Sequence, residues 1–158
     1  ILLMDDDEML RSATREMLRF LGWKVEEAAD GKEAIEKYKA AAASAASAPS
    51  AASAPSAPSA PSAPSAPSAP SAPSARLGFD AVIMDLTIPN GMGGQRAVEL
   101  LKQFDPKAKV IVSSGYHNSP IMAKYWEYGF IDCMPKPYSL AKLEEILERV
   151  TGSRPRST

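Results

Sequence analysis

The sequence predicts an α/β fold in which a parallel β-sheet is covered by helices on both sides. Short apolar runs alternate five times with segments whose apolar residues recur every three or four positions. Four of these runs end in charged or hydroxyl side chains. Strands that alternate with helices in this way favour a parallel sheet whose strands are joined by crossover helices.

The expected strands are the short apolar runs, typical of buried parallel strands. In chain order they are residues 1–4, 23–29, 81–85, 110–114 and 130–134. The first and third runs end in carboxylates, and the fourth ends in two serines. The fifth closes at Lys136 and Pro137.

The expected helices carry an apolar stripe with helical spacing. In chain order they cover residues 8–21, 30–39, 94–104, 119–129 and 140–150. Gly22 and Gly129 end the first and fourth helices, because glycine adopts the left-handed conformation of a helix end. Ser119 is expected to cap the fourth helix, with Pro120 at its first position.

A low-complexity tract interrupts this pattern. Residues 40–75 contain only Ala, Ser and Pro, and Ser-Ala-Pro is repeated seven times from 53 to 73. The tract has no large apolar side chain to bury, and its prolines block helix and sheet, so we expect a solvated, partly polyproline II loop. A spacer or a proline-rich ligand is the functional alternative.

The tract accounts for 36 of the 158 residues and contains none of the charged ones. The remaining 122 residues suit a single hydrophobic core. We therefore expect one domain over residues 1–151, interrupted by the 40–75 insert, and a flexible tail over residues 152–158.

Composition excludes several classes of protein. The net charge of −1 provides no basic field for nucleic acid. Cys133 is the only cysteine, so an internal disulfide and a cysteine-based zinc site are excluded. The apolar runs are too short to cross a membrane and no signal peptide is recognisable. We expect a cytoplasmic piece of a longer chain, because the sequence begins at Ile1 and not at a methionine.

Polar side chains gather where the predicted strands end. Asp5–Asp7 follow the first strand, Asp85 ends the third, Ser114 ends the fourth, and Lys136 follows the fifth. Ligands bind at the carboxyl edge of open α/β sheets, so these side chains are expected to converge there. Converging carboxylates repel one another unless a cation is present, and carboxylate oxygens suit Mg²⁺. With a lysine and a hydroxyl, the set predicts a site for a phosphoryl group, which one carboxylate can accept covalently.

Four motifs in this order resemble the response regulator receiver domain of two-component signalling. They are Ile-Leu-Leu-Met-Asp-Asp-Asp-Glu (1–8), Met-Asp-Leu-Thr-Ile-Pro (84–89), Ser-Gly (114–115) and Pro-Lys-Pro (135–137). The resemblance covers the chain except the tract and the last few residues. It implies a doubly wound, five-stranded parallel sheet of order 2-1-3-4-5 with five helices.

The resemblance also implies the metal ligands. Asp6 would ligate Mg²⁺ directly, and Asp5 would act mainly through water. Asp85 and the backbone carbonyl of Thr87, two residues later, would complete the protein's ligands.

Residues for the phosphoryl group follow from the same resemblance. Asp85 is the implied phosphoacceptor, and Lys136 pairs with its carboxylate or with a phosphoryl oxygen. Ser114 stands where the family has Thr or Ser, because it lies 22 residues before Lys136. Ser113 is the less favoured alternative.

The sequence departs from the family pattern in three places. The usual aromatic residue three positions before the lysine is replaced by Cys133, and Tyr116 and Tyr138 are candidate substitutes. The loop 89–94 is one residue longer than usual, and its glycines are expected to loosen it. This loop and the Ser-Ser-Gly-Tyr strand end are similar to receivers at the C-terminus of hybrid sensor histidine kinases. The 40–75 insert has no family counterpart.

The resemblance implies a phosphoacceptor signalling domain and not an enzyme. The donor would be a phosphohistidine on a histidine kinase or on a histidine phosphotransfer domain, and any output domain lies elsewhere. A haloacid dehalogenase-type phosphatase is disfavoured, since it needs an acid where Thr87 stands. A receiver that signals without phosphorylation is the other alternative.

Four further features each have a structural interpretation. Asp7 is expected to be a loop acid or a helix cap, and His117 a surface side chain. Cys133 is expected to pack as a small apolar residue, with redox sensing as the alternative. The aromatic residues Tyr125, Trp126 and Tyr128 either pack in the domain or line a surface for a partner.

Overall fold

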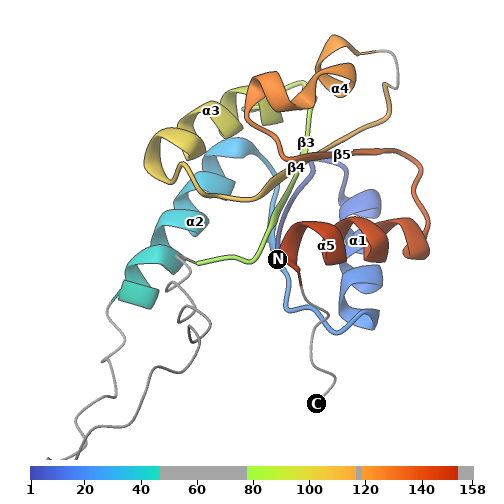
Figure 1. Ribbon diagram of the computed structural model, residues 1–158, viewed down its shortest axis with the longest axis horizontal. Helices are drawn as coiled ribbons and strands as arrows, with labels where there is room; N and C mark the ends of the chain where they lie inside the picture. Colours follow the sequence, from blue (N-terminus) through green and yellow to red (C-terminus); the bar gives the residue numbers. More distant parts are fainter. Residues whose placement is uncertain (47–77, 117–118, 153–158) are drawn as a thin grey trace, which may run out of the picture.

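Five parallel strands form one sheet in the order β2-β1-β3-β4-β5, as the sequence predicts. A computed structural model describes residues 1–46, 78–116 and 119–152 (Figure 1). The strands are β1 Leu2–Met4, β2 Glu26–Ala28, β3 Val82–Asp85, β4 Val110–Ser114 and β5 Asp132–Pro135. The helices are α1 Glu8–Phe20, α2 Gly31–Ala46, α3 Gly94–Phe104, α4 Pro120–Ala123, the 3₁₀ helix η1 Tyr125–Tyr128 and α5 Leu140–Thr151.

Each face of the sheet has its own hydrophobic core. Leu18 of α1 and Leu143 of α5 pack on one face, together with Leu3 and Ile83 of the strands. Ala34 and Tyr38 of α2 and Val98 of α3 pack on the other face. Successive strand residues point to opposite faces, so one apolar run supplies both cores. The predicted covering on both sides is thus confirmed (Figure 1).

Helix α2 extends further than the sequence predicts. It continues through residues 40–46 of the low-complexity tract, and Ala42 is buried. Alanine is the best helix former, and the first proline of the tract is Pro49, so nothing in this stretch ends the helix. The expected loop is therefore wrong for residues 40–46. The rest of the tract, His117 and the tail from 153 to 158 lie outside the described residues.

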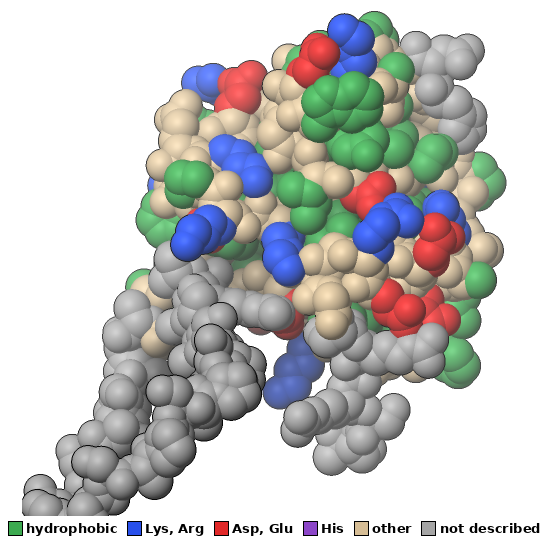
Figure 2. Space-filling view, viewed as in Figure 1, with side chains coloured by type: hydrophobic (Ala, Val, Ile, Leu, Met, Phe, Trp, Pro, Cys, Tyr) green, Lys and Arg blue, Asp and Glu red, His purple; other side chains and the backbone are tan. Residues whose placement is uncertain are grey.

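The helix expected over residues 119–129 is two shorter pieces. Ser119 accepts a hydrogen bond from the Ile121 amide and caps α4, but the backbone leaves the helical conformation at Lys124. The following 3₁₀ turn places Tyr125 and Tyr128 one above the other, and both pack against the core. Trp126 remains 60% exposed, and hydrophobic side chains gather near this segment in Figure 2.

The other differences lie at element ends. The second strand is shorter than residues 23–29, and the fifth begins two residues later than expected. Asp7 is confirmed as a helix cap, because its carboxylate accepts hydrogen bonds from the amides of Met9 and Leu10. No helix among the described residues has the length and apolar character that a membrane span requires.

Candidate functional site

Three carboxylates meet at the carboxyl edge of the sheet. Asp5 and Asp6 follow β1, and Asp85 is the last residue of the adjacent strand β3. One oxygen from each of the three lies within 4.8 Å of the others. Asp5 is 3% exposed, whereas Asp6 is exposed to solvent. The set therefore joins a buried acid, a half-buried acid and a solvent-facing acid at one point.

Lys136 bridges two of these carboxylates. Its Nζ donates to Oδ2 of Asp5 at 2.6 Å and to Oδ2 of Asp85 at 2.8 Å. All three side chains are largely buried, so solvent screens the interaction only weakly. Burial lowers the pKa of Lys136, but its bonds to Asp5 and Asp85 outweigh this and raise it. Burial raises the pKa of Asp5, against the opposing effect of Lys136.

Backbone amides fix the other carboxylate oxygens. The Asp7 amide donates to Oδ1 of Asp5 at 3.0 Å, and the Thr87 amide donates to Oδ1 of Asp85 at 3.2 Å. Asp5 and Asp85 thus each hold an amide on one oxygen and the lysine on the other. This pattern leaves little freedom for either carboxylate to rotate.

Arg11 supports the acidic loop from α1, a role that the sequence analysis missed. Its Nη1 donates to the backbone carbonyl of Asp5 at 2.6 Å, and its Nε pairs with Glu27 of β2 at 3.3 Å. The only sequence signal is an arginine one helical turn after the Asp7 cap. Arg11 therefore ties the loop that carries Asp5 and Asp6 to the neighbouring strand.

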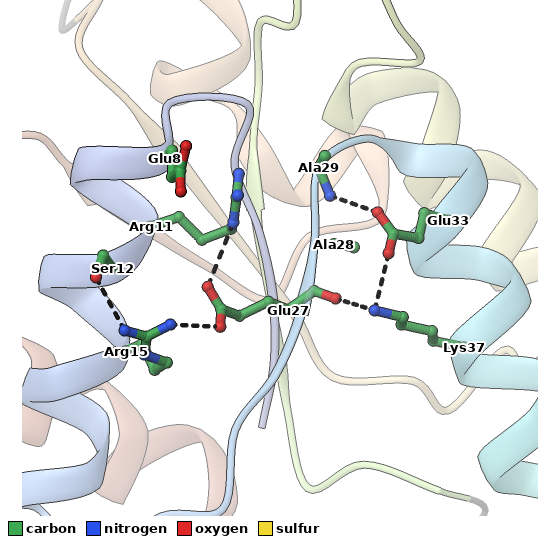
Figure 3. A pocket seen from close by; sticks show the side chains of 9 residues that line it. All are labelled: Glu8, Arg11, Ser12, Arg15, Glu27, Ala28, Ala29, Glu33 and Lys37. Atoms are coloured by element: carbon green, nitrogen blue, oxygen red, sulfur yellow. Dashed lines mark hydrogen bonds and ion pairs between the residues drawn. The ribbon is translucent and has the colours of Figure 1, made fainter.

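Arg11 lines a polar cleft of about 390 Å³ between α1, β2 and α2. Figure 3 shows the side chains of this cleft and the contacts between them. Arg15 also pairs with Glu27, at 2.9 Å, and Lys37 pairs with Glu33 at 2.8 Å. The cations of the cleft are thus paired with acids of the cleft itself. The network fastens the first two helices to the edge strand and leaves no unpaired cation for an outside anion.

Ser114 and Ser113 point to opposite faces of β4. The Ser114 hydroxyl is buried and accepts a hydrogen bond from the Tyr116 amide at 3.1 Å. Its backbone carbonyl accepts from the Lys136 amide at 2.8 Å, so β4 and the lysine loop are joined. The Ser113 hydroxyl is the only buried side-chain polar atom of the described residues without a hydrogen-bond partner.

The glycines after β3 allow close packing and are not a source of looseness. A Cβ at Gly94 would lie 2.6 Å from the carbonyl oxygen of Asp85, and one at Gly93 would lie 2.7 Å from that of Leu86. Both contacts are shorter than any side chain tolerates. The expectation that these glycines loosen the loop is therefore wrong at Gly93 and Gly94, because they let the start of α3 approach the backbone of Asp85.

Neither candidate tyrosine occupies the place of the missing aromatic residue. Cys133 is half-buried and packs against the core under α2 and α3, as expected for a small apolar side chain. Burial raises the pKa of its thiol. Tyr116 is 71% exposed, whereas Tyr138 packs on the opposite face, against the core under α1 and α5.

Comparison with known proteins identifies the family of this chain. The model of the response regulator receiver domain matches residues 63–148, more than half of the sequence, and the chain belongs to this family. Receiver domains are signalling domains of two-component systems, and this chain is one of them.

The relatives include small proteins of similar length. The chemotaxis protein CheY of Thermotoga maritima is 26% identical over 152 residues, which cover 96% of each protein. Protein CcdB of Bacillus subtilis is 28% identical over 153 residues, which cover 96% of this chain and 97% of that protein.

Solved receiver structures share the fold. The receiver domain of the Pseudomonas aeruginosa sensor histidine kinase PA1611, with magnesium coordinated in its active-site cleft, aligns with a TM-score of 0.67 at 21% identity, over 96% of both chains. The Borrelia burgdorferi CheX–CheY–BeF₃–Mg²⁺ complex aligns with a TM-score of 0.68 at 21% identity, over 94% of this chain and 86% of the other.

Proposed function

We propose that this receiver domain accepts a phosphoryl group from a phosphohistidine onto Asp85 in a reaction that requires Mg²⁺. The convergence of Asp5, Asp6 and Asp85 around Lys136 carries the proposal. A phosphoryl group on Asp85 brings further negative charge, which must be neutralised. Lys136 supplies one positive charge beside Asp85, and the carboxylates of Asp5 and Asp6 can hold a metal cation there.

The residues present fit a divalent cation. Three carboxylates and one lysine leave two uncompensated negative charges, and oxygen ligands are those that Mg²⁺ prefers. Asp5, Asp6, Asp85 and the backbone carbonyl of Thr87 would hold the ion. When bound, it would neutralise the oxygens of the incoming phosphoryl group.

The transfer step uses groups of this chain in stated roles. An Oδ of Asp85 attacks phosphorus, the P–N bond to the donor imidazole breaks, and the electron pair of that bond stays with the imidazole. Lys136 neutralises an oxygen of the product, and the Ser114 hydroxyl, whose oxygen accepts from the Tyr116 amide, donates its own proton to another. Water attack on the acyl phosphate later returns Asp85 and inorganic phosphate.

The donor would be a histidine kinase or a histidine phosphotransfer domain. Met9 is 84% exposed and Leu10 is 46% exposed on the first turn of α1, directly after the acidic loop. These side chains offer apolar contacts to a protein that brings its phosphohistidine to Asp85. We also propose that the parent chain is a hybrid histidine kinase in the cytoplasm, and the similarity of residues 88–94 and 113–116 to the receivers of such kinases supports the hybrid origin.

The domain boundaries belong to the same proposal. The folded unit spans residues 1–151 and is interrupted by the insert within residues 40–75, with residues 152–158 as a tail. The caps at Ser139 and Gly152 support the end of the unit, because they close α5 at both ends.

Incubation with Mg²⁺ and acetyl phosphate, followed by intact-mass measurement, tests the proposal. We expect one labile adduct with the mass of a single phosphoryl group, absent without Mg²⁺ and absent in Asp85→Asn. Asp105→Asn is the matched control, because Asp105 lies after α3 and far from the site, and it should be labelled like the wild type. A wild type without an adduct, or an unchanged adduct in Asp85→Asn, contradicts the proposal.

A further inference from the structure

Three hydroxyl groups meet on the face of the sheet that α1 and α5 cover. Thr14 of α1 and Tyr138, which follows β5, form a hydrogen bond of 2.8 Å between Oγ1 and the phenol oxygen. Thr14 is 3% exposed and Ser113 of β4 is 2% exposed. Burial raises the pKa of the Tyr138 phenol, and the nearby hydroxyls of Thr14 and Ser113 oppose this rise, although the Ser113 hydroxyl does not reach hydrogen-bond geometry. The cluster is thus a buried polar group within an apolar layer.

The buried hydroxyl groups of this cluster need one another as hydrogen-bond partners. Each hydroxyl carries one proton, so whichever of Thr14 and Tyr138 accepts the shared bond keeps a proton of its own. The Ser113 oxygen is a neighbouring buried acceptor without another partner. Breaking the Thr14–Tyr138 bond would leave buried hydroxyls unpaired, which is costly in an apolar layer. The pair is therefore held together by the burial around it.

This cluster is linked to the charged site through the segment from Lys136 to Tyr138. Lys136 lies two residues after Met134, which packs in the α1–α5 core, and two residues before Tyr138. Tyr138 also interacts electrostatically with both charged groups: Lys136 lowers its pKa and Asp5 raises it. The ring packs in the same core, so the tyrosine is fixed by apolar contacts and by its hydroxyl.

The lysine loop has few other anchors. Residues 136–139 connect β5 to α5, and Ser139 is committed to the α5 cap through the Lys142 amide. The Lys136 amide is held by the Ser114 carbonyl, but its long side chain has many rotamers. The Thr14–Tyr138 bond is the side-chain contact that fixes the following segment of this loop to α1.

We propose that Tyr138 is a positioning residue, whose hydrogen bond to Thr14 holds the 136–138 loop so that Lys136 Nζ stays between Asp5 and Asp85. The inference rests on the proposed phosphoacceptor function, because the position of Lys136 matters for charge neutralisation there. It assigns Tyr138 a role distinct from that of the missing aromatic residue at Cys133. Misplacing a catalytic group by a fraction of an ångström slows a reaction without abolishing it.

Two readouts in the intact chain test the inference. The first is the ¹⁵N-ammonium resonance of Lys136 in the protein without Mg²⁺, which is visible when paired carboxylates protect the ammonium from exchange. The second is the phosphorylation rate as a function of acetyl phosphate at saturating Mg²⁺. Tyr138→Phe should weaken the ammonium signal and lower the maximal rate by about three- to tenfold, the effect of one neutral hydrogen bond, with half-saturation unchanged.

Matched variants separate positioning from general stability. Thr14→Val should repeat the effect of Tyr138→Phe, and Thr14→Ser should restore both readouts, because it keeps the hydroxyl. Tyr38→Phe is the control, since it also removes a buried phenol hydrogen bond, the 2.8 Å bond to Asp105, at the other end of the molecule. It should leave the Lys136 signal and the rate at wild-type values.

Each outcome decides a separate question. An unchanged ammonium signal and rate in folded Tyr138→Phe overturn the inference, and so does an equal loss in Tyr38→Phe. If Tyr138→Phe does not fold, the contrast between Thr14→Val and Thr14→Ser gives the decision. A wild type that acetyl phosphate never labels refutes the proposed function, whereas the ammonium signal still reports whether Tyr138 positions Lys136.

Discussion

The two ends of the sheet are built from opposite chemistry. At the carboxyl edge, Asp5 and Asp85 share one lysine, and charge gathers in a largely buried place. At the other end, Tyr38 packs with Phe79 and, edge to face, with Phe104, and its hydroxyl donates to the carboxylate of Asp105, which follows α3. Burial and that carboxylate raise the Tyr38 pKa well above its usual value, so the phenol stays neutral.

The contrast explains where the chain tolerates an insert. The carboxyl edge depends on a few groups held at short distances, whereas the aromatic end is stabilised by apolar area that no single atom controls. Helix α2 ends at Ala46, and Gly78, at the other side of the undescribed segment, lies against Ala41 and Ala42. The insert therefore leaves and rejoins the domain at the aromatic end, away from the acids (Figure 1).

Removing Lys136 should have the largest effect on this contrast. Lys136→Ala leaves two buried carboxylates without their cation, and we expect the free energy of unfolding without Mg²⁺ to fall by about 3 kcal/mol. Mg²⁺ should recover most of the loss, because it supplies the missing positive charge. Urea unfolding with and without Mg²⁺ measures both effects.

Lys39→Ala is the matched control at the aromatic end. Lys39 lies 5.4 Å above the Phe104 ring and is exposed, so its removal should cost no more than about 1 kcal/mol, independent of Mg²⁺. Equal losses in the two variants would contradict the view that the charged edge depends on single groups.

A methyl group at Gly94 should disturb the site through the backbone. Gly94→Ala forces the start of α3 away from the Asp85 carbonyl, and we expect a loss of about 1–3 kcal/mol and slower phosphorylation. At Gly115 a Cβ meets nothing within 4 Å, so Gly115→Ala should keep its stability within about 0.5 kcal/mol. Thermal unfolding and acetyl phosphate labelling of both variants measure these effects. Wild-type stability and labelling in Gly94→Ala would refute the packing argument.

Shortening the insert should change stability but not phosphorylation. Replacing residues 47–77 with four Gly and Ser residues lowers the cost of loop closure, which should raise the free energy of unfolding by about 1–2 kcal/mol. The phosphorylation rate should match that of the full chain, because the aromatic end does not touch the acids. A clear loss of labelling in the folded, shortened chain would show that the insert acts on the site.

Asp5 should give the smallest effect, a change in pH dependence. Its folded pKa is raised above 3.8, so the folded state holds this proton more tightly than the unfolded chain does. Stability without Mg²⁺ should therefore fall as pH rises from 3.8 through the folded pKa, and the penalty is complete above it.

Asp5→Asn removes this titration, so the stability of the wild type relative to Asp5→Asn should decrease over the same pH range. Urea midpoints at several pH values measure the difference. Mg²⁺ should stabilise the wild type more than the variant. If the stability of the wild type relative to Asp5→Asn instead increases with pH, the effect of Lys136 on the pKa of Asp5 outweighs that of burial.

The sheet and the meeting of its polar side chains were predictable because both follow from periodicity. Apolar runs marked the five strands, and parallel strands bring their carboxyl ends together, so Asp5, Asp85 and Lys136 had to lie at one edge. Their distances were not predictable, because the amides of Asp7 and Thr87 and the guanidinium of Arg11 set them through local geometry.

The remaining differences have physical causes that composition hides. The alanines of residues 40–46 belong by composition to the insert, but their helix propensity and the neighbouring core extend α2. The interruption of the helix at Lys124 depends on how Tyr125 and Tyr128 pack against the core. The role of Gly94 depends on its close approach to the carbonyl oxygen of Asp85. Contacts between residues distant in sequence decide each of these features.

Locating the phosphoryl group tests the central claim most directly. Borohydride reduces an aspartyl phosphate to homoserine, so peptide mass spectrometry after Mg²⁺, acetyl phosphate and borohydride treatment identifies the acceptor. The geometry around Lys136 predicts homoserine at position 85 and at no other position. Homoserine at position 5 or 6, or none in the labelled protein, would contradict the assignment of Asp85.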